Sequence, residues 1–105
     1  MGVLVRRLER PGALVSRSES HQLRSGYVVL EPGEEVGRHQ TGAGEELIVV
    51  LEGIGEVVAN GHSRRVRAPS VVLVPAQTVH NVRNRSETTL RYVYVVLVGE
   101  DQDQR

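Results

Sequence analysis

The stretch GEEVGRHQTGAGEELIVVLEG, residues 33–53, decides the fold of this protein. It places His39 ahead of a glycine-spaced turn and Glu46 at the start of a strongly apolar run. Alternate residues of a strand share a face, so Glu46 lies on the same side as Ile48, and Thr41 shares the side of His39. A carboxylate on an apolar face requires a partner, because burying an unpaired charge is costly.

A second stretch, VPAQTVHNVRN at residues 74–84, places His80 on the same face as Thr78 and Val82. Two histidines and one glutamate on core-facing sides could all be satisfied by one divalent cation. Imidazole suits Zn, Fe, Ni and Cu, and two histidines with one carboxylate form the ligand set of non-haem Fe(II) oxygenases. These residues alone leave two interpretations open: a metal site, or histidines satisfied by ordinary core or surface contacts.

The rest of the chain is typical of a β protein, because short Val-rich segments recur between Gly, Pro, Asn and Ser. Asn60-Gly61 predicts a type I′ hairpin, and Pro32-Gly33 and Pro69-Ser70 predict further turns. Ser16–Ser20 and the last six residues are expected to be loose. Many short strands favour a sandwich or a small barrel. The expected strands are Val3–Leu8, Ala13–Val15, Gly26–Leu30, Glu46–Leu51, Gly55–Ala59, Ser63–Val66, Ser70–Val74, Thr78–Asn84 and Leu90–Val98.

Length and charge limit the class of protein. A chain of 105 residues predicts one domain, and a formal net charge of zero with Arg and Glu spread along it argues against nucleic acid as a partner. The apolar runs are far shorter than the roughly 20 residues that a membrane helix needs, so no membrane partner is expected. MGVLVRRLERPG at the N-terminus lacks the long apolar core of a secretory signal, and we expect a cytoplasmic protein.

Missing residue types restrict the chemistry further. Without Cys or Lys, the chain has neither thiolate nor Schiff-base catalysis. The two aspartates, Asp101 and Asp103, stand in the polar C-terminal tail, so carboxylate chemistry falls to Glu. Without Phe or Trp, a cavity would be lined by aliphatic side chains and at most by Tyr27, Tyr92 and Tyr94.

The spacing in both stretches resembles the paired motifs of the cupin superfamily. The first cupin motif runs Gly, five residues, His-x-His, three or four residues, Glu, six residues, Gly. This chain matches it with Gly33, His39, Thr41, Glu46 and Gly53, and departs from it where Thr41 replaces the second histidine.

The second cupin motif runs Gly, five residues, Pro-x-Gly, two residues, His, three residues, Asn. This chain matches it with Pro69, Pro75, Gln77, His80 and Asn84. Pro69 and Gln77 replace two glycines, which we expect to affect turns and to threaten the fold little.

The resemblance implies an all-β fold, a small double-stranded β-helix or jelly-roll barrel of the RmlC-like kind, with minimal helix. It implies a single cupin domain over residues 1–105, with the conserved barrel at about 26–98. Residues 1–25 would form an N-terminal strand segment and residues 100–105 a flexible tail.

The resemblance also implies that His39, Glu46 and His80 hold one divalent transition metal, with Fe, Mn, Ni and Zn left open. Thr41 would occupy a possible fourth position, and Gln40 is a weaker alternative for it. Three ligands leave open coordination positions, as catalytic metal sites require. The contrary interpretation is a barrel that has lost its metal with the second histidine.

Several other polar side chains are weighed and set aside as ligands. Tyr92 and Tyr94 are expected to serve core or dimer packing, with contact between their phenols and a ligand in the pocket as the alternative use. Glu45 is expected to be solvated, His62 to be exposed, and His21 to lie in a polar loop. Asn84 is expected to form hydrogen bonds at a strand end. An anionic substrate could be held by Arg38, Arg83, Arg85 and Arg91 if they pointed inward. We expect Arg38, Arg83 and Arg91 to be mostly external, because they alternate with the core faces.

Two functions of different classes follow from the site. One is a metal-dependent enzyme with dioxygenase-like or isomerase-like chemistry on a small oxygen-bearing metabolite. The other is a non-catalytic module that binds or senses a small molecule, with weak metal binding or none. A purely structural dimer is a third possibility. We expect a homodimer, in which VLVRRL at residues 3–8 could add an edge strand to the partner.

Overall fold

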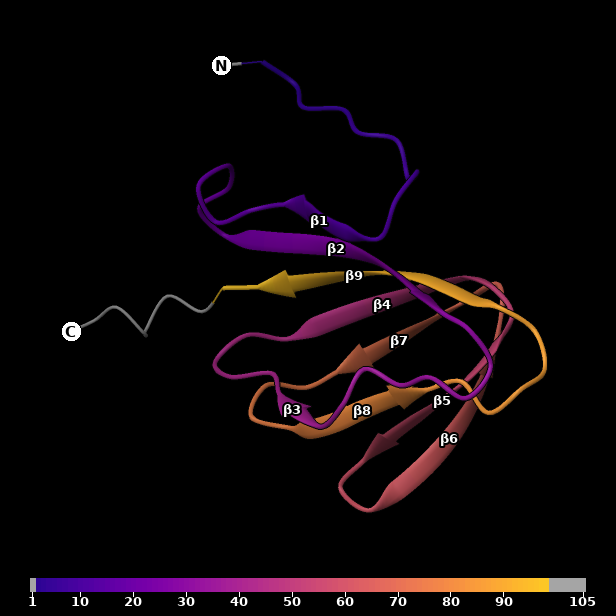
Figure 1. The fold of residues 1–105 in the computed structure, drawn as a ribbon. Coiled ribbons are helices and arrows are strands. Elements are labelled where there is room, and N and C mark those ends of the chain that lie inside the picture. Colours follow the sequence, from indigo (N-terminus) through magenta and orange to yellow (C-terminus); the bar gives the residue numbers. More distant parts are fainter. Residues whose placement is uncertain (1, 99–105) are drawn as a thin grey trace.

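The fold, a computed structural model that describes residues 2–98, is built from nine strands in two antiparallel sheets that face each other (Figure 1). The first sheet has the strand order β1-β2-β9-β4-β7, and the second has the order β3-β8-β5-β6. The strands are β1 Gly12–Val15, β2 Leu23–Leu30, β3 His39–Gln40, β4 Glu46–Glu52, β5 Ile54–Ala59, β6 His62–Arg67, β7 Ser70–Val74, β8 Val79–Arg83 and β9 Leu90–Leu97.

This arrangement is the all-β jelly-roll barrel that the sequence predicts, and residues 2–98 contain no helix. In that part of the chain, therefore, no helix is long and apolar enough to cross a membrane.

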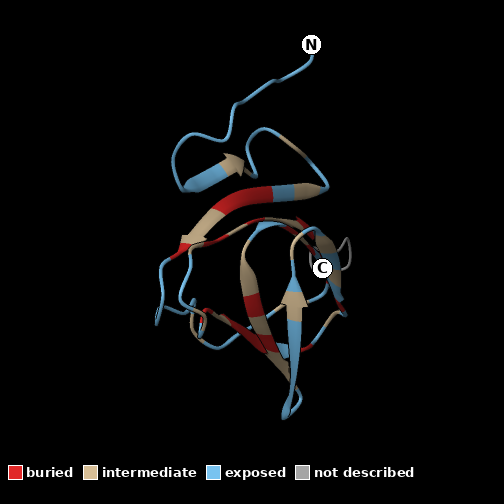
Figure 2. Cartoon of the chain, turned by 90° about the vertical axis from the view of Figure 1, so that its right-hand side faces the viewer, coloured by how far each residue is buried: buried red, intermediate tan, exposed pale blue. Residues whose placement is uncertain are grey.

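The core lies between the two sheets, where the inward faces of the strands meet (Figure 2). On β4, buried Glu46, Ile48 and Val50 alternate with more exposed neighbours, which is the period-2 pattern of a strand covered on one face. Valine supplies much of the remaining core, since its β-branched side chain packs well on a pleated surface. The buried cluster consists of Leu30, Ile48, Val50, Val57, Val74, Val82, Leu90 and Tyr92.

The hairpin between β5 and β6 confirms the turn predicted from Asn60-Gly61. Both residues have positive φ, 53° and 78°, as a type I′ turn requires. The flanking residues Ala59 and His62 are paired directly.

Two expectations for the N-terminal region are wrong. Residues 3–8 form no strand, because they have no neighbouring strand to pair with, and β propensity cannot replace that partner. Ser16–Ser20 is not loose, because the amides of Glu19 and Ser20 both donate to the carbonyl of Ser16. The Arg6 guanidinium bonds the Glu19 carboxylate at 2.7 Å and lowers the pKa of that carboxyl to about 2.

Smaller differences concern the ends of strands. β2 begins three residues before the expected Gly26, and β8 spans Val79–Arg83 rather than Thr78–Asn84. The short β3 was not among the expected strands. The tail at residues 100–105, with both aspartates, lies outside the described residues.

Asn84 joins three segments at the end of β8, in agreement with its expected role. Its side chain is fully buried and donates to the carbonyls of Leu30 and Thr88, each at 2.8 Å. Its backbone bonds Gly33 and Glu34. This residue therefore fixes the turn after β2, from which the chain proceeds to His39.

Gly53, the last residue of the first motif, is required by close packing. It has a φ of 92°, and a Cβ there would lie 2.2 Å from the carbonyl oxygen of Thr89. We predict that Gly53→Ala lowers the free energy of unfolding by about 2–4 kcal/mol, through overpacking and left-handed strain. Urea denaturation measures this change.

Gly33→Ala is the matched control, because Gly33 has a φ of 90° but a Cβ added there would meet no atom within 4 Å. Gly33→Ala introduces the left-handed backbone strain without a steric clash, so we expect its free energy of unfolding to fall by about 1–2 kcal/mol. Equal losses in the two variants would show that the contact with Thr89 is unimportant.

Candidate metal centre

The structure brings the three predicted ligands together from three strands. β3 pairs with β8 so that His39 lies directly opposite His80, with ring centroids 4.2 Å apart. Glu46 opens β4 in the facing sheet. One ligand atom from each of the three residues lies within 4.8 Å of the others.

Glu46 and His80 are buried, while His39 is exposed. His80 is 1% exposed and Glu46 is 6% exposed, so water can contribute little to solvating either group. His39 stands on the open side of the cluster. A bound ion would therefore be held from within by two buried groups and reached from the side of His39.

The hydrogen bonds of His80 leave its other ring nitrogen facing the carboxylate. Nδ1 lies 3.1 Å from the carbonyl oxygen of Thr78, which can only accept, so Nδ1 carries the proton and donates. Nε2 lies 2.9 Å from Oε1 of Glu46. Two acceptors would face each other there unless a proton or a metal cation lies between them.

His39 is oriented in the same way. Its Nδ1 lies 2.9 Å from the carbonyl oxygen of Gly37, which leaves Nε2 free to ligate. The Gly37 amide in turn donates to Oδ1 of Asn81 at 2.8 Å. Metal-binding histidines usually donate their second ring N–H to a carbonyl or carboxylate in this manner. The donor set and its orientation thus fit a divalent transition metal.

A cavity of about 330 Å³ opens beside the cluster. Tyr92 and Tyr94 are among its lining residues, and both also pack in the core, which is the use expected for them. Contact of either phenol with a ligand stays a prediction. Burial, together with the nearby Glu46 carboxylate, raises the pKa of the Tyr92 phenol, so the phenol stays protonated and can donate a hydrogen bond.

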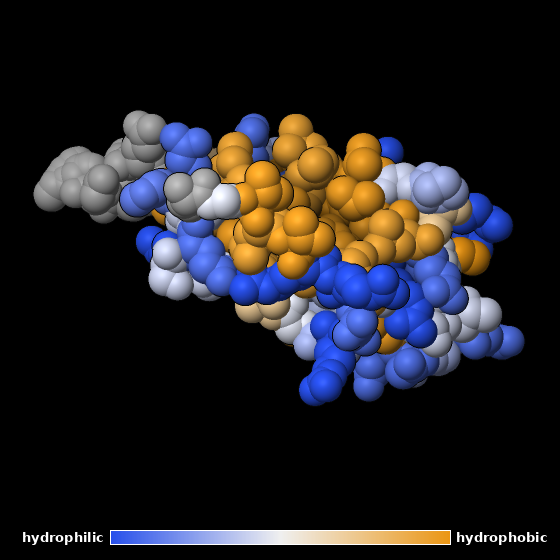
Figure 3. Space-filling model, turned by 90° about the horizontal axis from the view of Figure 1, so that it is seen from above, coloured by the Kyte–Doolittle hydropathy of each residue, from blue (hydrophilic) through white to orange (hydrophobic). Residues whose placement is uncertain are grey.

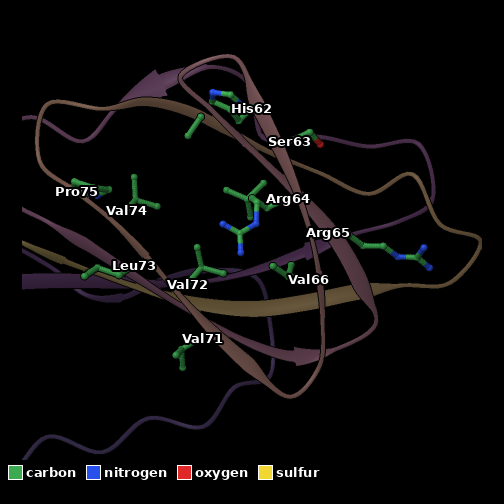
Figure 4. A pocket seen from close by; sticks show the side chains of 12 residues that line it. His62, Ser63, Arg64, Arg65, Val66, Val71, Val72, Leu73, Val74 and Pro75 are labelled. Carbon is green, nitrogen blue, oxygen red and sulfur yellow. The ribbon is translucent and has the colours of Figure 1, made fainter.

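A larger groove, of about 670 Å³, lies elsewhere, between β6 and β7 (Figure 4). Val66, Val72 and Val74 form part of its wall, and Arg64 points into it (Figure 4). The larger hollow is therefore not the one beside the candidate ligands. We place the site at the smaller cavity, because His39 and Glu46 line that cavity and a ligand atom of His80 lies within 4.8 Å of theirs.

Thr41 has a structural use in place of the missing histidine. Its hydroxyl donates to the carbonyl of Pro75 at 2.8 Å and accepts from the amide of Thr78 at 3.0 Å. These bonds hold the turn that leads into β8 and His80. The hydroxyl keeps one lone pair free, so ligation by Thr41 stays a prediction, as does ligation by Gln40, which is exposed and lines the cavity.

The remaining polar residues lie mostly where they were expected. Glu45, His62 and His21 are exposed. Arg83 and Arg91 bond Glu56 and Glu52, away from the cluster. Arg38 lies at the rim of the cavity.

Sequence reasoning missed Arg24, which also lines the cavity. The strand Gly26–Leu30 was expected to begin two residues too late to include it. Alternation backward from Val28 would have placed Arg24 on the inner face.

Thr41→Val tests whether the hydroxyl is structural. We predict that the free energy of unfolding falls by about 1–3 kcal/mol, since a carbonyl and an amide lose their partner, while metal affinity is unchanged. Denaturation and metal titration measure the two effects. In the control Thr89→Val, which removes an exposed bond to Glu31, the change should stay within about 0.5 kcal/mol. Weaker metal binding in Thr41→Val would instead make Thr41 a ligand.

Comparison with solved structures shows the same fold. A Cupin 2 conserved barrel domain protein from Salinispora arenicola aligns over 94% of this chain and 92% of its own, with 21% identity and a TM-score of 0.79. A predicted oxalate decarboxylase from Thermotoga maritima aligns over 85% and 79%, with 24% identity and a TM-score of 0.78. The Cnp3 cupin domain of Schizosaccharomyces pombe aligns over 90% and 64%, with 20% identity and a TM-score of 0.79.

Comparison of sequences agrees with the fold. Polyketide synthase CurC of Streptomyces cyaneus is 30% identical over 69 residues, which are 66% of this chain and 45% of that protein. The chain thus spans less than half the length of this relative. The family model of the cupin domain matches residues 26–96, which include both motifs. This protein therefore belongs to the cupin domain family.

Proposed function

We propose that this cupin holds one divalent transition metal through His39, Glu46 and His80 and acts on a small oxygen-bearing metabolite in the adjoining cavity. One observation carries the proposal: both imidazoles direct Nδ1 to a backbone carbonyl, while a buried carboxylate faces Nε2 of His80. A bound divalent metal supplies Lewis-acid polarisation of a substrate oxygen, or activation of O₂ if it is iron.

The chain's own residues would bind and orient the substrate. Val28, Val36 and Val96 line the cavity, so its walls are partly apolar. Its volume of about 330 Å³ suits a small molecule. The protonated Tyr92 phenol can donate to a substrate oxygen. Dioxygenase-like and isomerase-like reactions both suit this arrangement, and the differing names of the similar proteins favour neither.

A non-catalytic binding module is the second candidate, and the cavity gives a specific reason for it. Glu46 is the one carboxylate among the described lining residues, and metal ligation would occupy it. No second carboxylate of residues 2–98 lines the cavity to serve as a general base. Saturable binding of a small molecule without turnover, in protein loaded with each of Fe(II), Mn(II), Ni(II) and Zn(II), would favour this alternative.

Metal content tests the proposal. We predict near-stoichiometric metal in the purified protein by elemental mass spectrometry, and loss of at least about 90% of it in His39→Ala and in His80→Ala, because each removes one of only three protein ligands. His62→Ala, which removes an exposed histidine outside the cluster, should keep its metal.

Circular dichroism should show intact strands in every variant, so that loss of metal is not loss of fold. Absence of metal from the wild type, even after anaerobic loading with Fe(II), would contradict the proposal.

We also propose that the protein is a homodimer. The outer face of the first sheet carries exposed Leu47, Leu51, Val71, Leu73 and Leu97, from 38% to 65% exposed. Val49, Val93 and Val95 lie between them. Apolar side chains gather in one broad patch on this side of the molecule (Figure 3).

A second copy of the chain suits this face, because aliphatic side chains can pack against the same side chains of the partner. Among the described residues, the centre of the face carries no charged group. Extended, contiguous apolar surfaces are rare on monomers and usually mark interfaces. The free edge of β7 and the exposed side chains of Val3 and Val5 offer additional pairing at the margin.

Val71→Glu combined with Leu73→Glu should convert the dimer to a monomer, because association would bury two carboxylates without partners. Light scattering should give about twice 11.6 kDa for the wild type and 11.6 kDa for the variant. Val79→Glu, at an exposed aliphatic position of the other sheet, is the control and should remain dimeric. A monomeric wild type would refute the interface.

A further inference from the structure

We propose that Arg24 is the anchor for a carboxylate of the substrate, so that the cavity takes a short-chain dicarboxylate or a similarly sized oxygen-bearing acid. The inference rests on the proposed function, because it places one end of the substrate at the metal. It adds the class of substrate and a residue that selects it.

The strand register puts Arg24 on the wall of the candidate centre. Arg24 pairs with Val96 of β9, and Val96 pairs with Glu46 of β4. The three residues form one row across the sheet and share its inner face. With strands about 4.8 Å apart, the backbones of Arg24 and Glu46 are roughly 10 Å apart. Side chains extend from both ends of that span, so the gap suits a molecule of a few carbon atoms.

Arg24 differs from several other arginines of the protein because its guanidinium has no side-chain partner among the described residues. Arg6, Arg83 and Arg91 each form an ion pair with a glutamate. Among residues 2–98, no side-chain hydrogen bond or ion pair involves Arg24. It is exposed and lines the cavity, and no side chain of residues 2–98 accepts from its five donors, which can therefore bind an incoming anion.

The surroundings of Arg24 leave room at this end of the cavity. Gly26, next on the inner face of β2, lies so close to Tyr94 that a Cβ would be 2.5 Å from the phenol ring and its oxygen. Tyr94 therefore covers the strand at Gly26, and the space beside Arg24 is bounded by Val96. Val96 stands between Arg24 and Glu46 in the row, and its small side chain lets an anion reach both the guanidinium and the candidate metal centre.

Charge in the cavity favours an acid. Among the described lining residues the arginines are Arg24 and Arg38, and the one carboxylate, that of Glu46, belongs to the cluster. Arg38 neighbours His39 in the chain and also borders a second hollow, behind β8, so it contributes at the rim. Of the two, Arg24 is the arginine that the strand register places on the inner face of the sheet. A guanidinium binds a carboxylate through two parallel hydrogen bonds, which fixes direction as well as position.

Calorimetric titration of zinc-loaded protein tests the anchor without any assay of turnover. The probes are malonate, succinate and glutarate, with butyrate as a monocarboxylate of the length of succinate. We expect at least one dicarboxylate to bind about tenfold tighter than butyrate. Arg24→Gln should remove that advantage, a loss of about tenfold or more, and leave butyrate and zinc affinities unchanged.

Two further variants make the result specific. Arg24→Lys keeps the charge but not the paired donors and should recover only part of the affinity. Arg64→Gln removes a cation that points into the other groove and should bind the dicarboxylates like the wild type.

Zinc uptake without any preference for dicarboxylates, or a preference that survives Arg24→Gln, would overturn the anchor and leave the metal site standing. Failure of the wild type to take up zinc or any other divalent metal would overturn the proposed function, and the anchor with it.

Discussion

The buried contact between Glu46 and His80 is the constraint on which the rest of the site depends. It joins the two sheets through polar groups that lie almost out of reach of water. A buried polar or charged group without a partner is costly, so this contact persists only where its surroundings satisfy both groups. Thr78 fixes the ring of His80, and a cation between nitrogen and carboxylate would satisfy both.

Most of the strands were predictable from local signals, whereas the jelly-roll barrel was expected from the resemblance of two motifs to those of cupins. Alternation placed Glu46 with Ile48 on the inner face, and Asn60-Gly61 set a hairpin whose positive φ angles the structure contains. The strand expected at residues 3–8 did not form. Its side chains have the right propensity, but a strand requires a neighbour, and nothing in a local pattern says whether the same chain provides one.

The site was predictable in its residues but not in its supporting contacts. Motif spacing selected the three donors, whereas the carbonyl partners of both histidines depend on backbone geometry. The same is true of Thr41, whose hydroxyl bonds two groups more than thirty residues away. Arg24 was missed for a different reason: the expected strand began at Gly26, so Arg24 was not placed in a row with Val96 and Glu46.

The three-ligand cluster therefore gives the jelly-roll barrel its candidate chemistry, and the position of a bound ion is its most direct test. Anomalous diffraction from crystals grown with zinc, measured on both sides of the zinc edge, would locate the ion. Our account predicts one strong peak bonded to Nε2 of His39, Nε2 of His80 and a carboxylate oxygen of Glu46, at about 2.0–2.2 Å from each. A peak elsewhere, or an ordered cluster with no peak in zinc-saturated crystals, would contradict it.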